Sequence, residues 1–373
     1  MKALGIILAG GSNSRMKRLT AKRALAAMPI GCSYRAIDFA LSSMASSRIR
    51  TVAVLSQYNT RSLSEHLNSS KWWQFGRKQG GLFVFAPTVT PENSWWYRGT
   101  ADSMFQNMDF LRDHHEPYVV IASADGIYKM DFNEMLDYHI DKGADITIAC
   151  AKMPEGGDAS RFGMISLNEA GVITEFEEKP LASDSNLVSA GIYILRRRRL
   201  IELLERCNEE DRHNFVTGVI MKHVGQKKMY GFRMDGYWDN VSSLESYYKI
   251  NMDMLRPEVQ QYFFTSYKHE IYSKAADLPP TKYNKGSHVV NSLIGSGSII
   301  NSSVENSVIF KNVYVGNGSI VKDSLIMHGV YIGDNARVEN CIVESNETLL
   351  SGSNYIGEGE IRVIADGHKR YEI

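Results

Sequence analysis

The chain has 373 residues, enough for a large domain and a smaller second one, and its 42 Lys and Arg balance its 42 Asp and Glu. A formal net charge of zero speaks against general binding to nucleic acid or to a membrane surface, because both favour excess positive charge. The four cysteines form no CxxC pair, and the apolar run 3–9 is too short to span a membrane. We therefore expect a cytoplasmic protein without nucleic-acid or membrane partners.

Short apolar runs alternate with helix-like segments over residues 1–251, which we expect to form one domain. Buried strands are predicted for the four runs at 3–9, 52–55, 118–122 and 146–150. Helical spacing is found at 103–114 and 131–139. This order predicts an α/β fold with a Rossmann-like, mostly parallel sheet and helices on both faces. Such sheets bind ligands beyond the carboxyl ends of their strands.

The C-terminal part of the chain repeats itself. Residues 252–286 are expected to form a helix and an extended linker, and the repeats follow over 287–373. Similar tetrads begin at Asn291, Asn306, Asp323 and Asn340, at steps of 15, 17 and 17 residues. Aliphatic residues also recur six apart, and three such steps per coil predict a triangular parallel β-helix.

A glycine pair follows the first predicted strand and is suited to phosphate chemistry. Gly10 and Gly11 would let backbone N–H groups approach a phosphate, and Arg15 would add positive charge. Such a pair is also typical of an ordinary tight turn, and no GxxxxGK[ST] loop occurs in the chain.

Further motifs give nearly the whole chain a resemblance to a known family. They are RALA from Arg23, YRAIDF from Tyr34, YRGTAD from Tyr97, DGIYKMD from Asp125, RFG from Arg161, FEEKP from Phe176 and GYWDNV from Gly236. With these residues the chain resembles ADP-glucose pyrophosphorylase (glucose-1-phosphate adenylyltransferase) of bacterial glycogen and plant starch synthesis. The resemblance implies a nucleotidyltransferase domain, a left-handed β-helix and a tetramer. It also implies a Mg²⁺-dependent attack of glucose 1-phosphate on the ATP α-phosphate, giving ADP-glucose and pyrophosphate.

The resemblance also implies roles for individual residues. The catalytic candidates are Arg15 and Asp125, of which Asp125 is the first metal-binding aspartate. The nucleotide contacts are Gly10, Gly11, Gly99 and Thr100. The sugar-phosphate contacts are Tyr97, Gly163, Glu178, Lys179 and Ser189.

Three departures from the family pattern fall on phosphate or metal handling. Asn13 stands at the third glycine of the triphosphate loop, Leu25 at a lysine, and Asn240 at the second metal-binding aspartate. Each change removes a close approach or a charge, while the implied sugar contacts remain. We therefore expect weak or absent Mg²⁺ binding and a regulatory, weakly active or inactive subunit. Its expected partner is a catalytic paralogue, in a heterotetramer, with a homo-oligomer when the chain is alone.

Alternatives remain open at this point. A competent enzyme would need a metal site re-routed through Asp239 or water, although Asp239 should face away from Asn240 in an extended segment. A third hypothesis is a stand-alone sensor of sugar phosphate. Ser242 and Glu245 are expected to form a capping box. The arginine run Arg196, Arg197, Arg198 and Arg199 is either a solvated helix start or a site for an anionic effector.

Overall fold

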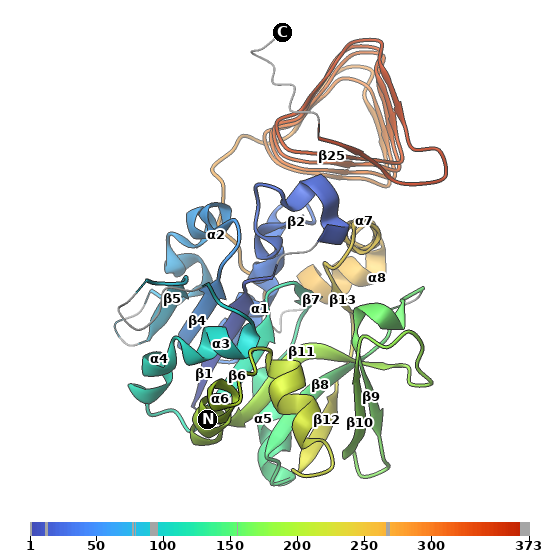
Figure 1. The fold of residues 1–373 in the computed structure, drawn as a ribbon. Helices are drawn as coiled ribbons and strands as arrows, with labels where there is room; N and C mark the ends of the chain where they lie inside the picture. The colour runs from blue at the N-terminus through green and yellow to red at the C-terminus, as the bar shows by residue number, and fades with distance from the viewer. Residues whose placement is uncertain are drawn as a thin grey trace.

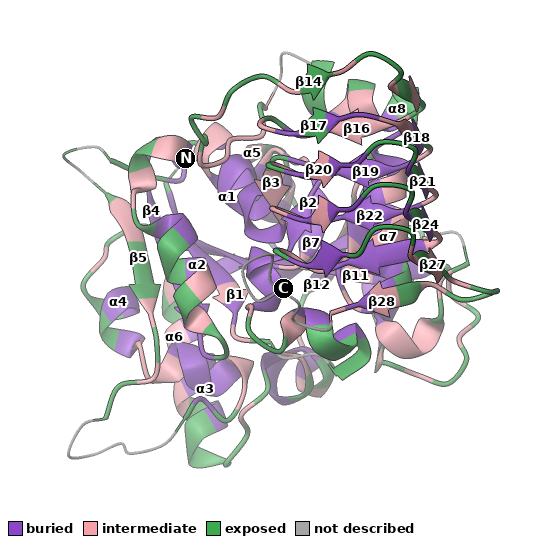
Figure 2. Ribbon diagram, turned by 90° about the horizontal axis from the view of Figure 1, so that it is seen from above, coloured by how far each residue is buried: buried purple, intermediate pink, exposed green. Residues whose placement is uncertain are grey.

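The computed structural model describes residues 2–11, 14–76, 78, 80–89, 96–154, 156–265 and 269–365. A triangular β-helix stacks on an α/β domain, and the two parts are joined by an extended segment (Figure 1). Buried residues follow the central strands of both parts, whereas exposed residues cover the outer helices and loops (Figure 2). In the described part of the chain, no helix is long and apolar enough to cross a membrane.

The α/β domain is built on a nine-stranded sheet of order β10-β9-β11-β6-β1-β4-β5, with β8 beside β11 and β12 beside β8. Its strands are β1 (Ala3–Ala9), β4 (Thr51–Ser56), β5 (Gly81–Phe85), β6 (Tyr118–Ser123), β8 (Ile146–Lys152), β9 (Gly163–Leu167), β10 (Ile173–Glu178), β11 (Leu187–Arg196) and β12 (Met229–Arg233). Only β10 and β11 run against the other strands of this sheet. The prediction of a mostly parallel sheet is therefore confirmed, and the four predicted strands are β1, β4, β6 and β8.

Helices cover both faces of the sheet. They are α1 (Ala36–Ser46), α2 (Thr60–Leu67), α3 (Thr100–Phe105), α4 (Met108–Arg112), α5 (Phe132–Asp141) and α6 (Arg197–Glu209). The remaining helices, α7 (Leu244–Asp253) and α8 (Pro257–Gln260), pack in a separate apolar cluster with the β-helix. Alternate residues of β1 enter different core clusters: Ile7 packs in the cluster with α1 and α5, and Leu4 in the cluster with α3 and α6. Each face therefore buries its own layer of helices.

Short elements complete the domain. The 3₁₀-helical segments are η1 (Ser14–Thr20), η2 (Leu25–Ala27), η3 (Ser70–Trp73) and η4 (Ala159–Arg161), and the π-helical segments are η5 (Val216–Met221) and η6 (Gln261–Thr265). Two small ribbons pair β2 (Pro29–Ile30) with β3 (Tyr34–Arg35), and β7 (Gly126–Tyr128) with β13 (Trp238–Asn240). The β7–β13 ribbon joins segments that are far apart in the sequence, and it is central to the candidate site.

Two helix predictions need correction. The segment predicted as one helix over 103–114 is two helices, α3 and α4, because the chain turns at Gln106 and Asn107. The capping box of α7 begins at Ser243 and is closed by Ser246, one residue later than predicted. Ser242 therefore lies outside the helix and is free of the capping role.

The C-terminal part is a parallel β-helix of three five-stranded sheets. The three faces are β14-β17-β20-β23-β26, β15-β18-β21-β24-β27 and β16-β19-β22-β25-β28. Their strands are β14 (Lys282–Tyr283), β15 (His288–Val290), β16 (Leu293–Ile294), β17 (Ile299–Ile300), β18 (Ser303–Glu305), β19 (Val308–Ile309), β20 (Tyr314–Val315), β21 (Ile320–Lys322), β22 (Leu325–Ile326), β23 (Tyr331–Ile332), β24 (Arg337–Glu339), β25 (Cys341–Val343), β26 (Thr348–Leu349), β27 (Asn354–Ile356) and β28 (Arg362–Ile364). The hexapeptide pattern and this topology fit the expected left-handed β-helix. Its first strand lies inside the segment expected as linker, because β14 already pairs with the next coil.

The predicted tetrads mark one corner of the β-helix. Asn291, Asn306, Asp323 and Asn340 all have positive φ, between 42° and 50°. Asn and Asp tolerate this left-handed region better than other residues with a side chain. Their side chains also bond from coil to coil, with 2.9 Å from Asn291 Nδ2 to Asn306 Oδ1. The repeat is therefore set by the backbone requirement of the corner.

The β-helix packs on the α/β domain through one apolar cluster. Met28 and Leu25 from the N-terminal segment share this cluster with Phe310 and Met327 of the β-helix. Beside it, Arg23 lies 3.1 Å from Glu344, and both side chains are only 19% exposed. The segment that precedes and includes η2 is therefore held against the β-helix.

Candidate nucleotide and sugar-phosphate site

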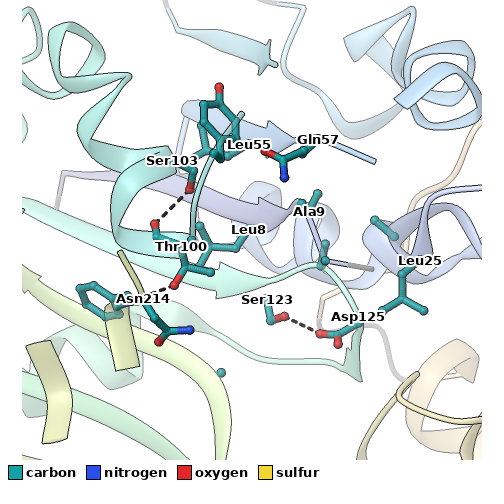
Figure 3. A pocket seen from close by; sticks show the side chains of 18 of the residues that line it. Leu8, Ala9, Leu25, Leu55, Gln57, Thr100, Ser103, Ser123, Asp125 and Asn214 are labelled. Carbon is teal, nitrogen blue, oxygen red and sulfur yellow. Dashed lines mark hydrogen bonds between the residues drawn. The ribbon is translucent and has the colours of Figure 1, made fainter. Parts of the chain in front are cut away.

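A pocket of about 430 Å³ opens at the carboxyl ends of β1, β4 and β6, and we call it the larger pocket. Gly10 and Gly11 line it after β1, Gln57 after β4, and Ser123 and Asp125 at the end of β6. Figure 3 shows these strand ends around the pocket, with Leu25 and Asp125 at the same end of it. The location is the one expected for a ligand of an α/β sheet.

The four predicted nucleotide contacts all line the larger pocket. A Cβ added to Gly11 would meet nothing within 4 Å, so the backbone there is open to a ligand. Glycine is required at position 99 for a structural reason, because a Cβ added to Gly99 would lie 2.4 Å from the carbonyl oxygen of His213. Thr100 begins α3, and its hydroxyl accepts a hydrogen bond from the backbone of Phe215 at 2.8 Å.

The predicted phosphate-handling residues fare differently. Asn13 lies outside the described residues. Arg15 is exposed and is not among the residues that line the pocket. Burial lowers the pKa of Arg161, and the positive charge of Arg15 lowers it further. Leu25 does line the pocket, with only 7% of its surface exposed. An uncharged side chain therefore faces the pocket where the resemblance implies a lysine.

Asp125 and Asn240 lie side by side on the β7–β13 ribbon. Asn240 pairs with Gly126, and the backbone N–H of Val241 donates to the carbonyl of Asp125 at 2.9 Å. The Asp125 carboxylate accepts a hydrogen bond from Ser123, and burial raises its pKa. The carbonyl oxygen of the Asn240 side chain is buried and has no hydrogen-bond partner among the described residues. The two side chains thus offer a carboxylate and an unused amide oxygen at one place.

Asp125 and Asn240 offer the oxygen ligands that Mg²⁺ favours, but together they carry only one negative charge. Mg²⁺ favours oxygen ligands, and carboxylates supply most of the charge that holds it. The described residues contain no group of three His, Cys, Asp or Glu side chains that could hold a metal. A bound ion would therefore be held by Asp125, by the amide oxygen of Asn240 and by oxygens of the bound substrates.

Asp239 faces away from this place. It is 2% exposed, and its carboxylate lies 3.2 Å from the ammonium of Lys249 on α7. Its other oxygen accepts the backbone N–H of Asn240 at 2.8 Å. Lys249 also binds Asp253 at 3.0 Å. Asp239 is therefore engaged on the α7 side of the ribbon.

A smaller pocket of about 140 Å³ adjoins the larger one and shares Asp125, Lys179 and Tyr193 with it. Of the predicted sugar-phosphate contacts, Gly163, Glu178, Lys179 and Ser189 line the smaller pocket. Tyr97 does not; it lines the larger pocket beside Gly99, and its hydroxyl accepts a hydrogen bond from Asn107 at 2.9 Å.

The lining of the smaller pocket is tightly built. A Cβ added to Gly163 would lie 2.6 Å from the ring of Phe176 and 3.1 Å from Glu178, so only glycine fits there. Lys179 has φ of 54°, a conformation that costs of order 1 kcal/mol or more for a residue with a side chain and is found most often at ligand sites. This backbone sets Lys179 between the two pockets, with its ammonium 3.5 Å from Glu178.

Several lining residues were not predicted from the sequence. The hydroxyl of Ser123 donates a hydrogen bond to Asp125, and Tyr193 lines both pockets. Gln57 lines the larger pocket, and its buried side-chain oxygen has no hydrogen-bond partner within the described part of the chain. Gln57 could have been predicted from the sequence, since it follows a predicted strand. Arg161 lines the smaller pocket and donates hydrogen bonds to the hydroxyl of Ser242, one of them 3.0 Å long. The contact between Arg161 and Ser242 could not be predicted, because the two residues are 81 positions apart in the sequence.

The arginine run lies at the far end of β11 from these pockets. Arg197 donates to the carbonyls of Leu111 and Glu116 at 2.7 and 2.9 Å, which is a structural role. Arg198 is exposed. Arg196 and Arg199 line a separate cavity.

The chain is similar to known proteins over most of its length. Residues 4–256 match the nucleotidyl transferase family, and residues 275–365 match the GlmU-like C-terminal hexapeptide family. The chain is 39% identical over 355 residues to "Glucose-1-phosphate adenylyltransferase" of Bacillus cereus (strain Q1), covering 94% of each chain. It is 38% identical over 321 residues to the protein of the same name from Thermosipho africanus, covering 86% of this chain and 77% of the relative.

Together, the sheet with its pocket at the strand ends, the hexapeptide β-helix and these similarities agree with one another. The similarity spans both domains and includes the residues that line both pockets. The chain belongs to the glucose-1-phosphate adenylyltransferase family of nucleotidyltransferases.

Proposed function

We propose that this chain is a regulatory, weakly active or inactive subunit of a glucose-1-phosphate adenylyltransferase, which modulates a catalytic paralogue in glycogen synthesis. The observation that carries the proposal is the pair Asp125 and Asn240, where one carboxylate stands beside a neutral amide. Two carboxylates at this place would bring twice the charge to a metal between nucleotide and sugar phosphate.

Leu25 strengthens the proposal independently. The larger pocket must compensate the charge of a triphosphate if it is to bind and activate ATP. A buried leucine contributes no charge to that compensation and makes the local dielectric lower. Loss of one preorganised charge of this kind commonly lowers turnover by about 10²–10³.

Bound Mg²⁺ would neutralise phosphate charge and polarise the α-phosphate toward attack. In this chain Asp125 and the side-chain oxygen of Asn240 would hold it. With a single carboxylate, binding of Mg²⁺ is expected to be weak. The raised pKa of Asp125 acts in the same direction, because protonation removes the remaining charge.

A re-routed metal site through Asp239 is less well supported. Its carboxylate is held by Lys249 and by the backbone of Asn240 on the other side of the ribbon. Turning it toward Asp125 would leave Lys249 without one of its two carboxylate partners. The unpartnered oxygen of Asn240 is the observation that favours residual catalysis.

Regulation of a paralogue would use contact between subunits, and the chain has a route for it. The segment that carries Leu25 lines the larger pocket and also packs against the β-helix, where Arg23 binds Glu344 and Ser345. A partner that moves the β-helix would thereby act on a pocket-lining segment. A coupling of 1–3 kcal/mol is typical of such linkage.

The test is to express this chain with a paralogue that has glycine, lysine and aspartate at the positions of Asn13, Leu25 and Asn240. We expect co-purification as a heterotetramer and a change in turnover or effector response relative to the paralogue alone. Failure to co-purify, with unchanged kinetics, would contradict the proposal and favour the stand-alone sensor.

A further inference from the structure

A cavity of about 330 Å³ lies away from both pockets, where α6 begins. Its walls include Tyr118 at the start of β6, His139 near the end of α5, and Arg196 and Arg199 at the start of α6. Tyr118 and Arg196 are paired across β6 and β11, whose opposite ends carry the candidate site. In Figure 1, α5 and α6 lie in the part of the α/β domain that is remote from the β-helix.

Two guanidinium groups bring positive charge to this cavity. Arg196 lies over the ring of Tyr118 at 5.8 Å and forms no ion pair among the described residues. Arg199 binds Glu202 at 2.8 Å and is 4.0 Å from Asp145, the one carboxylate among the described residues that line the cavity. Asp145 in turn accepts the backbone N–H of Lys228 at 3.1 Å.

His139 is the second, independent feature. It is 2% exposed, and its Nδ1 bonds the hydroxyl of Thr147 at 2.8 Å. Its Nε2 is buried and has no hydrogen-bond partner among the described residues. A buried polar atom left unpaired destabilises the folded state, so its retention calls for an explanation. With Nδ1 engaged, Nε2 is the ring atom that remains to serve a ligand.

The start of α6 adds to the attraction for a negative group. This helix has thirteen residues, and its first turn contains no acidic side chain. The backbone N–H groups of a helix start favour anions. Burial and the charge of Arg196 lower the pKa of His139 to about 4, so the ring is neutral at pH 7 and can donate from Nε2 when Thr147 donates to Nδ1.

We infer that this cavity binds a phosphate group, either free or as the ester of a small metabolite. Arg196 and Arg199 would bind its oxygens, and His139 would donate a third hydrogen bond. Asp145 competes for Arg199, which makes Arg196 the main determinant of affinity. The inference does not depend on the proposed regulatory function, since it rests on residues at the opposite end of the sheet.

Calorimetry on the full chain tests this binding site. Inorganic phosphate and glycerol 3-phosphate are titrated separately, in a Lys179→Ala background that weakens phosphate binding in the candidate site. The substitution Arg196→Gln should weaken binding of at least one of them by about tenfold or more. The control Arg198→Gln removes the same charge from the same helix, at an exposed position outside the cavity, and should change affinity less than twofold.

The two titrants also separate the sources of the phosphate group. Binding of free phosphate assigns the cavity to the inorganic ion, and binding of the ester alone assigns it to a metabolite. Absence of binding by both, or equal weakening by Arg196→Gln and Arg198→Gln, would overturn the inference.

An NMR titration locates the ligand. The His139 ring resonance, assigned with His139→Gln, should shift on adding phosphate, and its pKa should rise from about 4. Phosphate binding that leaves this resonance unchanged would place the ligand elsewhere and contradict the inference.

Discussion

The larger and the smaller pocket share one wall but differ in what their side chains can bind. The smaller pocket has a charged pair, Glu178 and Lys179, and a glycine that admits them. The larger pocket has Leu25 where positive charge is expected. Asn240 lines the smaller pocket and offers an amide beside Asp125, which lines both pockets. The comparison teaches that a site can present a charged pair in one pocket while an uncharged side chain stands in the adjoining pocket where the family resemblance implies a lysine.

The fold accommodates Leu25 and Asn240 because each side chain satisfies a local requirement. Leu25 packs in the apolar cluster that joins the two domains, and Asn240 keeps the strand pairing with Gly126. Charged groups buried near a ligand cost free energy of folding, so their loss is tolerated or even favourable. Retention of the fold therefore says little about retention of catalysis.

The largest expected effect comes from restoring the lost charges. The purified chain should release pyrophosphate from ATP and glucose 1-phosphate at least about 10²–10³ more slowly than a relative with intact motifs. The combined change Asn13→Gly, Leu25→Lys and Asn240→Asp should raise this rate. Turnover by the unmodified chain equal to that of an intact relative would contradict the interpretation of the larger pocket.

The next effect concerns the retained pocket. Lys179→Ala removes an ammonium that lines both pockets and should weaken glucose 1-phosphate binding by about 10- to 100-fold, because charge-assisted bonds to phosphate are lost. Lys152→Ala, at an exposed position at the end of β8, is the control and should leave the affinity unchanged. Equal effects of both variants would show that the smaller pocket does not bind the phosphate.

Asp239 separates a structural role from a metal-binding one. Asp239→Asn should lower the free energy of unfolding by about 1–3 kcal/mol, because Lys249 loses a buried carboxylate partner. Urea unfolding measures this cost, with the exposed Asp235→Asn as the control. The Mg²⁺ affinity should stay the same. A marked loss of Mg²⁺ binding at unchanged stability would support the re-routed metal site instead.

The smallest expected effect is the pH dependence at Asp125. Burial raises the pKa of this carboxyl above its unfolded value, so the folded state holds its proton more tightly and stability falls as the pH rises through that interval. Asp125→Asn should therefore stabilise the protein by about 1 kcal/mol above the folded pKa, and the gain should vanish below the unfolded value. Urea unfolding at alkaline and acidic pH measures the difference. The same gain at both pH values would argue against a buried charge.

Local patterns predicted the parts of the fold that depend on local requirements. Apolar runs recur because each buried strand requires apolar side chains. The tetrads at Asn291, Asn306, Asp323 and Asn340 recur because each corner requires a residue that tolerates positive φ. The boundary of the β-helix was placed too late, because β14 has no tetrad of its own and is defined only by pairing with β17. The break between α3 and α4 was not predicted, because the helical periodicity of the sequence continues across it.

The site was predictable only in part. Gly10 and Gly11 follow a strand, so position along the chain was enough to select them. The closeness of Asp125 and Asn240 came from the family pattern, because it depends on the distant pairing of β7 with β13. Tertiary structure alone determines the places of Ser123 and Tyr193 and the contact of Arg161 with Ser242. No periodicity in the sequence predicts them.

Calorimetry of the purified chain with glucose 1-phosphate and with Mg-ATP is the most direct test of the contrast between the two pockets. The retained contacts at Glu178 and Lys179, against the uncharged Leu25 and Asn240, predict that glucose 1-phosphate binds and that Mg-ATP binds more weakly or undetectably. Tighter binding of Mg-ATP than of glucose 1-phosphate would contradict the account, because it would mean that the larger pocket kept its function and the smaller one lost it.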